Sequence, residues 1–122
     1  MCGVAGFLWR RGGAAARDAE AIVGGMAEAI AHRGPDSSGT WVDREAGIAL
    51  GHRRLAILDL SAAGHQPMVS PSGRYVLSYN GEVYDHADLR AALEAENRAP
   101  RWHGTSDTET LVAAFDARGV PG

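Results

Sequence analysis

The chain has 122 residues, of which 45% are hydrophobic and 22% are charged, and its formal net charge is −3 at pH 7. This composition supports one folded domain and argues against intrinsic disorder, and the small negative charge argues against a nucleic-acid-binding face. The single cysteine excludes an intramolecular disulfide, and no apolar run approaches the roughly 20 residues of a membrane-spanning helix. We therefore expect a cytoplasmic protein that binds neither nucleic acid nor membranes.

Hydrophobic periodicity predicts strands and helices along the chain. Short apolar runs predict strands over 3–9, 40–42, 48–51 and 75–79. Apolar residues three and four positions apart predict helices over 14–31, 86–96 and 107–118. A turn at 43–47 joins two of the strands, and the long loop at 52–73 is of a length that often signals function. This order favours an α+β or layered α/β fold with antiparallel sheets.

Two local patterns add detail to these predicted elements. The last helix is expected to turn Leu111, Val112 and Phe115 inward. The dipeptide Asn80-Gly81 follows a predicted strand and, taken alone, is typical of a type I′ hairpin turn. The local sequence therefore leaves a structural role open for this dipeptide.

Cys2 stands directly behind the initiator methionine and is the only cysteine of the chain. Removal of Met1 would leave a free α-amine beside the thiol, so that one residue would hold both a base and a nucleophile. An α-amine titrates near ~7.7–8.0 and a thiol near ~8.5, both close to neutral pH. If Met1 stays, the nitrogen is an amide and the base is lost. The alternative is a small residue that merely happens to come second.

Further motifs follow Cys2 in a fixed order. They are CGVAGF at 2–7, HRGPDSSG at 32–39, GHRRLAILDLS at 51–61, GHQPM at 64–68, YNGEVYD at 79–85 and GTSDTE at 104–109. Together they resemble the glutaminase domain of the glutamine-hydrolysing asparagine synthetases, which are class II glutamine amidotransferases of the N-terminal nucleophile hydrolase group. The resemblance implies an α+β fold, a four-layer αββα sandwich, of which residues 2–122 would form a part that stops before the C-terminal strands.

The resemblance also implies the catalytic residues. Cys2 would attack the side-chain amide of glutamine, release ammonia and leave a γ-glutamyl thioester for water to hydrolyse. Asn80 and Gly81 would form the oxyanion hole, through the asparagine side-chain NH2 and the glycine backbone N–H.

The substrate-binding residues implied by the resemblance fall into three groups. Arg54 would grip the α-carboxylate of glutamine, and its neighbour Arg53 is expected to be solvated. Glu82 and Asp107 would hold the α-ammonium, although Asp107 also resembles an N-cap of the last helix. Backbone contacts along the substrate would come from Leu55, Ala56, Ile57 and Leu58. Structural support behind Cys2 is expected from His32, Arg33 and Asp36.

The resemblance implies L-glutamine as the substrate. The positions of His52, His65, His86 and His103 do not give metal-ligand spacing, so we expect no metal, and no other cofactor, in this domain. ATP and Mg²⁺ would serve only the synthetase domain, which is missing from this sequence and would use the ammonia to amidate aspartate. Any dimer is expected to form through the full-length protein. The sequence leaves open a glutaminase that serves another acceptor, a non-catalytic glutamine-binding module, and an N-terminal piece without an independent role.

Overall fold

The computed structural model describes residues 2–56 and 60–120. These residues form two compact units, which are described separately. The first unit contains residues 2–56, 65–67 and 78–80. The second unit contains residues 60–64, 68–77 and 81–120.

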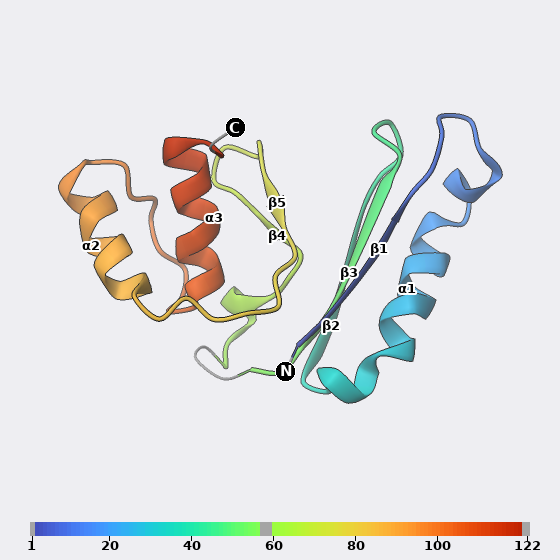
Figure 1. The fold of residues 1–122 in the computed structure, drawn as a ribbon, viewed down its shortest axis with the longest axis horizontal. Helices are drawn as coiled ribbons and strands as arrows, with labels where there is room; N and C mark the ends of the chain where they lie inside the picture. Colours follow the sequence, from blue (N-terminus) through green and yellow to red (C-terminus); the bar gives the residue numbers. More distant parts are fainter. Residues whose placement is uncertain (1, 57–59, 121–122) are drawn as a thin grey trace. The chain divides into compact units, whose positions relative to one another are not determined.

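The first unit is a helix packed on a three-stranded antiparallel sheet (Figure 1). Its strands, in their order across the sheet, are β1 (Gly3–Leu8), β3 (Ile48–Arg54) and β2 (Ser37–Asp43). Helix α1 (Ala19–Ala29) lies along one face of this sheet. Ala19, Val23 and Ala27, four residues apart on one face of α1, are all fully buried. The small alanine side chains let the helix lie close to the sheet.

Strand β3 is the centre of this sheet and sets the register on both sides. It pairs with β1 from Gly3↔Arg53 to Leu8↔Ile48, and with β2 from Ser37↔Arg54 to Asp43↔Ile48. The turn between β2 and β3 closes through Gly47, whose N–H donates to the Asp43 carbonyl at 2.9 Å and whose φ is +76°. The predicted turn at 43–47 is therefore present.

The second unit combines a short hairpin with two helices (Figure 1). The elements are β4 (Met68–Val69), β5 (Val76–Leu77), α2 (His86–Ala95) and α3 (Asp107–Arg118). Asp116 of α3 holds the hairpin, because it accepts from the Ser70 hydroxyl at 3.1 Å, from the Ser72 backbone N–H at 3.0 Å and from the Ser72 hydroxyl. These bonds, the Ser72 hydroxyl first among them, lower the pKa of Asp116. A carboxylate thus fastens the hairpin to α3.

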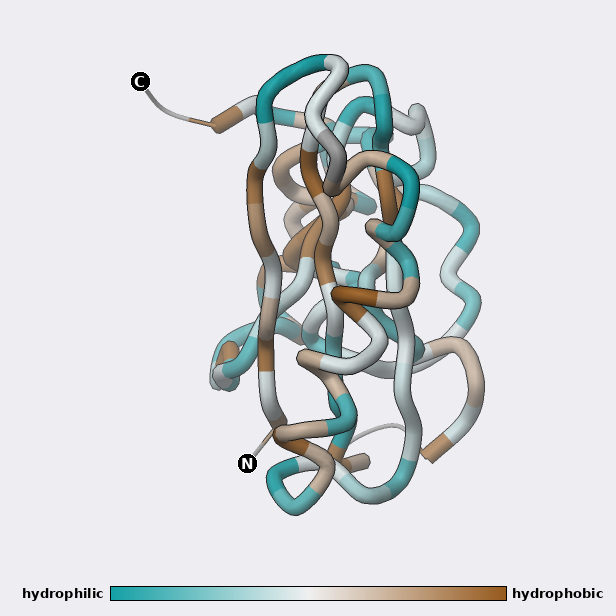
Figure 2. The backbone as a smooth tube through the Cα atoms, turned by 90° about the vertical axis from the view of Figure 1, so that its right-hand side faces the viewer, coloured by the Kyte–Doolittle hydropathy of each residue, from teal (hydrophilic) through white to brown (hydrophobic). Residues whose placement is uncertain are grey.

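The elements differ from the predicted ones mainly at their ends. The first helix is shorter than 14–31, because only Ala19–Ala29 is α-helical and 3₁₀ turns flank it. The last helix spans 107–118 as predicted, but of its expected inward residues Val112 is buried while Leu111 and Phe115 are only partly buried. Hydrophobic and hydrophilic residues are interspersed along the whole backbone, and several of the loops are hydrophilic (Figure 2). The mixture of helices and antiparallel sheets is compatible with the α+β class.

The strand predicted over 75–79 contains only Val76 and Leu77 in the structure. The backbone of Tyr79 bonds instead to the side chains of His52 and Gln66, which removes it from any strand ladder. Asn80-Gly81 is not a hairpin turn, because the chain passes from β5 to α2 without a second strand. The local interpretation of this dipeptide is therefore wrong.

We predict that Gly25→Ala stabilises the protein by about 1 kcal/mol. Gly25 lies inside α1, and a Cβ added there meets no atom within 4 Å. Alanine therefore gains helix propensity without a clash. Urea denaturation should show a higher midpoint.

Gly47→Ala is the matched control for this prediction. Its φ of +76° disfavours alanine, and its Cβ would lie 2.4 Å from the Trp9 carbonyl oxygen. This variant should unfold at a lower urea concentration than the parent. A lower midpoint for Gly25→Ala, or an unchanged one for Gly47→Ala, would contradict the packing described.

Candidate active site

Cys2 is anchored at the end of β3. The pairing of β1 with β3 begins at Gly3↔Arg53, so the residue before Gly3 meets the chain where β3 ends. The Cys2 Sγ accepts from the Leu55 N–H at 3.3 Å, and the thiol can donate to the Leu55 carbonyl at 3.6 Å. Cys2 is partly buried and not part of any disulfide. The sheet register therefore determines where the thiol lies.

The segment that precedes β2 forms hydrogen bonds both to Cys2 and to the residues that follow β3. Arg33 Nε donates to the Cys2 carbonyl at 3.3 Å, and Asp36 Oδ2 accepts from the Ala56 N–H at 2.8 Å. The Asp36 N–H also donates to the Arg54 carbonyl at 3.0 Å. Arg33 thus contacts Cys2 itself and Asp36 contacts the residues on either side of Leu55, as expected of supporting residues. His32 is exposed.

Arg53 and Arg54 have different surroundings, because successive residues of a strand face opposite sides. Arg54 is only 8% exposed. Arg53 donates through Nε to the Gly34 carbonyl at 2.9 Å and pairs with Glu28 at 3.5 Å, and only 13% of its side chain is exposed. The expectation that Arg53 is solvated is therefore wrong, because it ties β3 to α1.

Asn80 belongs to the first unit and is exposed. The residue before it, Tyr79, is held through both of its backbone polar groups. His52 Nε2 lies 3.0 Å from the Tyr79 carbonyl oxygen, and the Tyr79 N–H donates to Gln66 Oε1 at 2.7 Å. His52 is 1% exposed and Gln66 is 6% exposed. Two buried side chains from distant parts of the sequence thus fix the chain directly before Asn80.

The environment of His52 keeps its imidazole neutral. Burial is the main cause that lowers the pKa of His52, with smaller effects in the same direction from His65 and Arg54, and the bond to Tyr79 opposes them. A carbonyl oxygen only accepts, so Nε2 carries the proton. The Nδ1 atom is buried and has no partner among the described residues. Protonation would place a buried, unpaired N–H there.

Gly81, Glu82 and Asp107 belong to the second unit. The Val83 N–H donates to Asp107 Oδ2 at 2.9 Å, which holds the chain beside Glu82 against the start of α3. Asp107 is buried at 8% exposure, whereas Gly81 and Glu82 are exposed. The N-cap of α3 is Ser106, whose hydroxyl accepts from the Glu109 N–H at 3.2 Å. The N-cap interpretation of Asp107 is therefore wrong, because Asp107 is the first helical residue.

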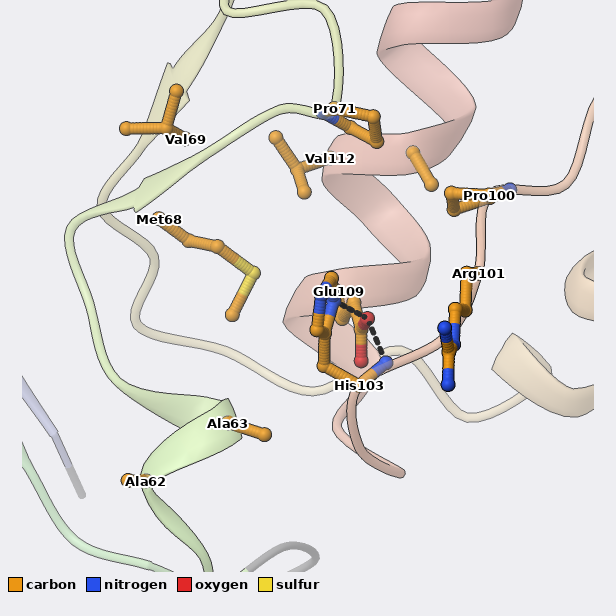
Figure 3. Close-up of a pocket in the computed structure, with 11 residues that line it drawn as sticks. Ala62, Ala63, Met68, Val69, Pro71, Pro100, Arg101, His103, Glu109 and Val112 are labelled. Carbon is orange, nitrogen blue, oxygen red and sulfur yellow. Dashed lines mark hydrogen bonds and ion pairs between the residues drawn. The ribbon is translucent and has the colours of Figure 1, made fainter.

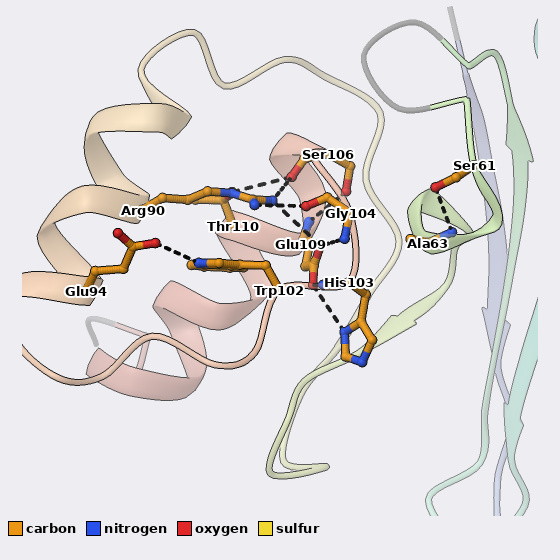
Figure 4. Close-up of polar contacts among 10 residues, drawn as sticks. All are labelled: Ser61, Ala63, Arg90, Glu94, Trp102, His103, Gly104, Ser106, Glu109 and Thr110. Atoms are coloured by element: carbon orange, nitrogen blue, oxygen red, sulfur yellow. Dashed lines mark hydrogen bonds and ion pairs between the residues drawn. The ribbon is translucent and has the colours of Figure 1, made fainter.

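Arg90 and Glu109 form a polar network that sequence reasoning missed (Figure 4). Glu109 accepts from the backbone N–H groups of His103 at 2.7 Å and Gly104 at 2.9 Å. Arg90 donates to the Gly104 carbonyl at 2.9 Å and to the Ser106 carbonyl at 3.1 Å. The Ser-x-x-Glu spacing of a capping box could have indicated Glu109, but Arg90 has no comparable local signal. The network fixes the loop that presents Asp107.

A pocket of about 640 Å³ lies within the second unit (Figure 3). Its walls are largely apolar and include Met68, Val69, Pro71, Pro100 and Val112. None of the site residues predicted from the sequence and described by the structure lines it. Its most buried charged group, Glu109, is already satisfied by backbone N–H groups. The predicted chemistry therefore does not belong to this pocket.

The predicted site residues fall into three sets. The first unit holds Cys2, Arg54, Leu55, Ala56 and Asn80. The second unit holds Gly81, Glu82 and Asp107. Ile57 and Leu58 lie outside the described residues.

Two further features are absent from residues 2–56 and 60–120. These residues contain no group of three or more His, Cys, Asp or Glu side chains placed to hold a metal ion. Within the same residues, the helices are too short or too polar to cross a membrane.

We predict that acid weakens this fold partly through His52. The folded state lowers the pKa of His52, so the unfolded chain binds a proton first as the pH falls. Its contribution to stability is complete above the ordinary pKa of about 6.5 and is lost as the pH falls from there through the lower pKa of the folded state. The melting temperature should therefore drop between neutral pH and about pH 5.

His52→Gln provides the comparison, because glutamine keeps an N–H donor and does not titrate. The drop in melting temperature between the same two pH values should be smaller in this variant. An equal drop in both proteins would mean that His52 does not contribute.

Comparison with known proteins places the chain in a family. A family model described as a glutamine amidotransferase domain matches residues 1–121. "Asparagine synthetase [glutamine-hydrolyzing] 2" of Bacillus subtilis (strain 168) is 38% identical over 98% of this chain and 15% of its own length. "Amidase chry2" of Gibberella zeae is 35% identical over 98% of this chain and 18% of its own length.

A "Putative asparagine synthetase [glutamine-hydrolyzing]" of Mycobacterium tuberculosis (strain CDC 1551 / Oshkosh) is 36% identical over 94% of this chain and 19% of its own length. The chain thus spans less than a fifth of each of these relatives. The match of the family model over nearly every residue shows that this chain belongs to the glutamine amidotransferase domain family.

Proposed function

We propose that this chain is the glutaminase part of an asparagine synthetase and hydrolyses L-glutamine to glutamate and ammonia, with Cys2 as the nucleophile. The observation that carries the proposal is the anchoring of the Cys2 Sγ on the Leu55 N–H at 3.3 Å, beside the buried Arg54, in a chain of this family. The finer fold that goes with it is the four-layer αββα sandwich, of which the helix-on-sheet arrangement of the first unit would supply two layers.

The proposed reaction starts when removal of Met1 frees the α-amine of Cys2. The amine takes the thiol proton, and the thiolate attacks the carboxamide carbon of glutamine. The negative oxygen that forms accepts hydrogen bonds from the Asn80 side-chain NH2 and the Gly81 N–H. The C–N bond then breaks, the protonated amine returns its proton to the departing nitrogen, and ammonia leaves. Water attacks the thioester, releases glutamate and regenerates the thiol.

Substrate recognition rests on the charges of free glutamine. Arg54 is assigned to the α-carboxylate, because a guanidinium binds a carboxylate through two parallel hydrogen bonds. Glu82 and Asp107 are assigned to the α-ammonium, and the Val83–Asp107 bond supports a common place for these two carboxylates. Leu55, Ala56, Ile57 and Leu58 are assigned backbone contacts. A glutamine residue within a peptide lacks both end charges and would be rejected.

The ammonia would serve an ATP-dependent amidation of aspartate. That step needs ATP and Mg²⁺, which belong to the synthetase part, and no cofactor is proposed for the glutaminase itself. Another acceptor remains a second candidate, because one relative of similar identity carries the name of an amidase. Glutamine-dependent ammonia release separates both enzyme proposals from a non-catalytic glutamine-binding module.

We predict that glutamine-dependent ammonia release falls to background in Cys2→Ser, because the nucleophile is lost. It should also fall to background in a protein whose Cys2 amine is blocked by a retained Met1, because an amide cannot act as the base. Mass spectrometry of the N-terminus, together with an ammonia assay, measures both effects.

A glutamine analogue with an electrophilic side-chain carbon provides the control. In the processed parent it should label Cys2 alone. Full activity in a protein with a blocked amine, or label on another residue, would refute the mechanism.

We predict that Arg54→Lys raises KM for glutamine by about tenfold or more, since lysine loses the two-pronged bond to the carboxylate. Arg53→Lys is the matched control and should leave KM unchanged, because Arg53 contacts Gly34 and Glu28 instead. Steady-state kinetics with glutamine separates the two variants.

A second substrate tests the assignment of Arg54 directly. γ-Aminobutyramide lacks the α-carboxylate, so Arg54→Lys should process it as slowly as the parent does. A parallel loss on both substrates would assign Arg54 a structural role instead.

A further inference from the structure

The short segment before Asn80 is fixed by side chains rather than by a strand ladder. The Tyr79 carbonyl oxygen lies 3.0 Å from His52 Nε2, and the Tyr79 N–H lies 2.7 Å from Gln66 Oε1. Both distances are those of well-formed hydrogen bonds. Within the same unit, the Ser78 hydroxyl reaches the Gly51 carbonyl at 3.5 Å. The chain that leads to Asn80 is thus held at both backbone polar groups of one residue, Tyr79.

The two partners of Tyr79 are buried, which makes these bonds sensitive to substitution. His52 is 1% exposed and is one of the largest fully buried side chains, and Gln66 is 6% exposed. A backbone group that loses a buried partner is left unsatisfied, and the chain must move to regain one. Neither His52 nor Gln66 has a role in the reaction proposed above, so their burial beside Asn80 needs an explanation.

Strand β3 links the hydrogen bond between His52 and Tyr79 to the position of Cys2. His52 lies on β3, and the Leu55 N–H that binds the Cys2 Sγ lies three residues further along the same chain. In extended chain three residues span roughly 10 Å. The Tyr79 backbone and the Cys2 thiol are therefore both positioned from one rigid strand within one unit.

We propose that His52 and Gln66 are positioning residues for glutamine hydrolysis, because by binding the two backbone polar groups of Tyr79 they hold Asn80 where its side-chain amide meets the oxyanion. This inference rests on the proposed function of Cys2 and Asn80. An oxyanion donor acts only if it is fixed in place before the reaction, since a donor that must first reorient loses most of its effect. Burial and the two-sided hold on Tyr79 supply that fixation.

The first test is a matched pair of amide substitutions at His52. In His52→Gln the side-chain nitrogen is as many bonds from Cβ as Nε2 and can still donate to Tyr79, whereas in His52→Asn it replaces Nδ1 and cannot reach. We expect His52→Gln to keep kcat within about threefold and His52→Asn to lower it by about tenfold to a hundredfold, with KM for glutamine nearly unchanged. Gln66→Met, which removes the acceptor, should act like His52→Asn.

The second test asks whether the loss acts through Asn80. Asn80→Ala removes the oxyanion donor and should lower kcat by about 10²–10³. If His52 acts only by placing Asn80, adding His52→Asn to Asn80→Ala should lower kcat by less than about threefold more. Equal losses in both backgrounds, an unchanged kcat in His52→Asn and Gln66→Met, or an effect on KM alone would overturn the inference.

Failure of the inference can be told from failure of the proposed function. Absence of ammonia release by the parent, or activity that survives Cys2→Ser, defeats both. A Cys2-dependent parent in which His52→Asn and His52→Gln are equally active defeats the positioning role alone. Melting curves and electrophile labelling of Cys2 show whether each variant is folded. If His52→Asn has lost its melting transition, Gln66→Met takes its place in the comparison.

Discussion

The antiparallel register of β1 on β3 is the constraint on which the candidate site depends. It begins at Gly3↔Arg53, so the residue before β1 meets the residues that follow β3. Because side chains alternate faces along a strand, a slip of one residue would turn every side chain of β1 to the other face and move Cys2 away from Leu55. Six consecutive pairs, together with the pairing of β3 to β2 on its other side, resist such a slip.

Contacts between buried polar groups also position candidate site residues, separately in each of the two units. In the first unit, Gly39 of β2 lies so close to the Gln66 backbone carbonyl that a Cβ there would be 2.0 Å from its oxygen, so only glycine lets Gln66 lie this near β2. In the second unit, the first turn of α3 is buried although it is polar from Asp107 to Thr110. Burial of such groups is tolerated only when each finds a partner, and the bonds of Glu109 and Arg90 supply several of them. Asp107 is thus held in a rigid setting.

The parts of the fold that follow local patterns could be predicted from the sequence, and those that depend on distant side chains could not. The strand that begins at Gly3 and the helix over 107–118 are set by hydrophobic periodicity and match the structure closely. The strand predicted over 75–79 is only Val76–Leu77 in the structure, because Tyr79 bonds to His52 and Gln66, and no local pattern reveals these bonds. In the same way, the motifs indicated Arg54, but only the structure showed that Arg53 pairs with Glu28.

The charges around β3 make the neutrality of His52 consistent with the proposed chemistry. Burial lowers the pKa of His52, the bond to Tyr79 opposes this, and smaller electrostatic effects of His65 and Arg54 act in the same direction as burial. A charged imidazole would leave its Nδ1–H buried without an acceptor among the residues that the structure describes. The neutral ring instead donates its one N–H to the Tyr79 carbonyl oxygen. His52 thus serves as a hydrogen-bond donor to the Tyr79 carbonyl without adding a charge to its buried surroundings.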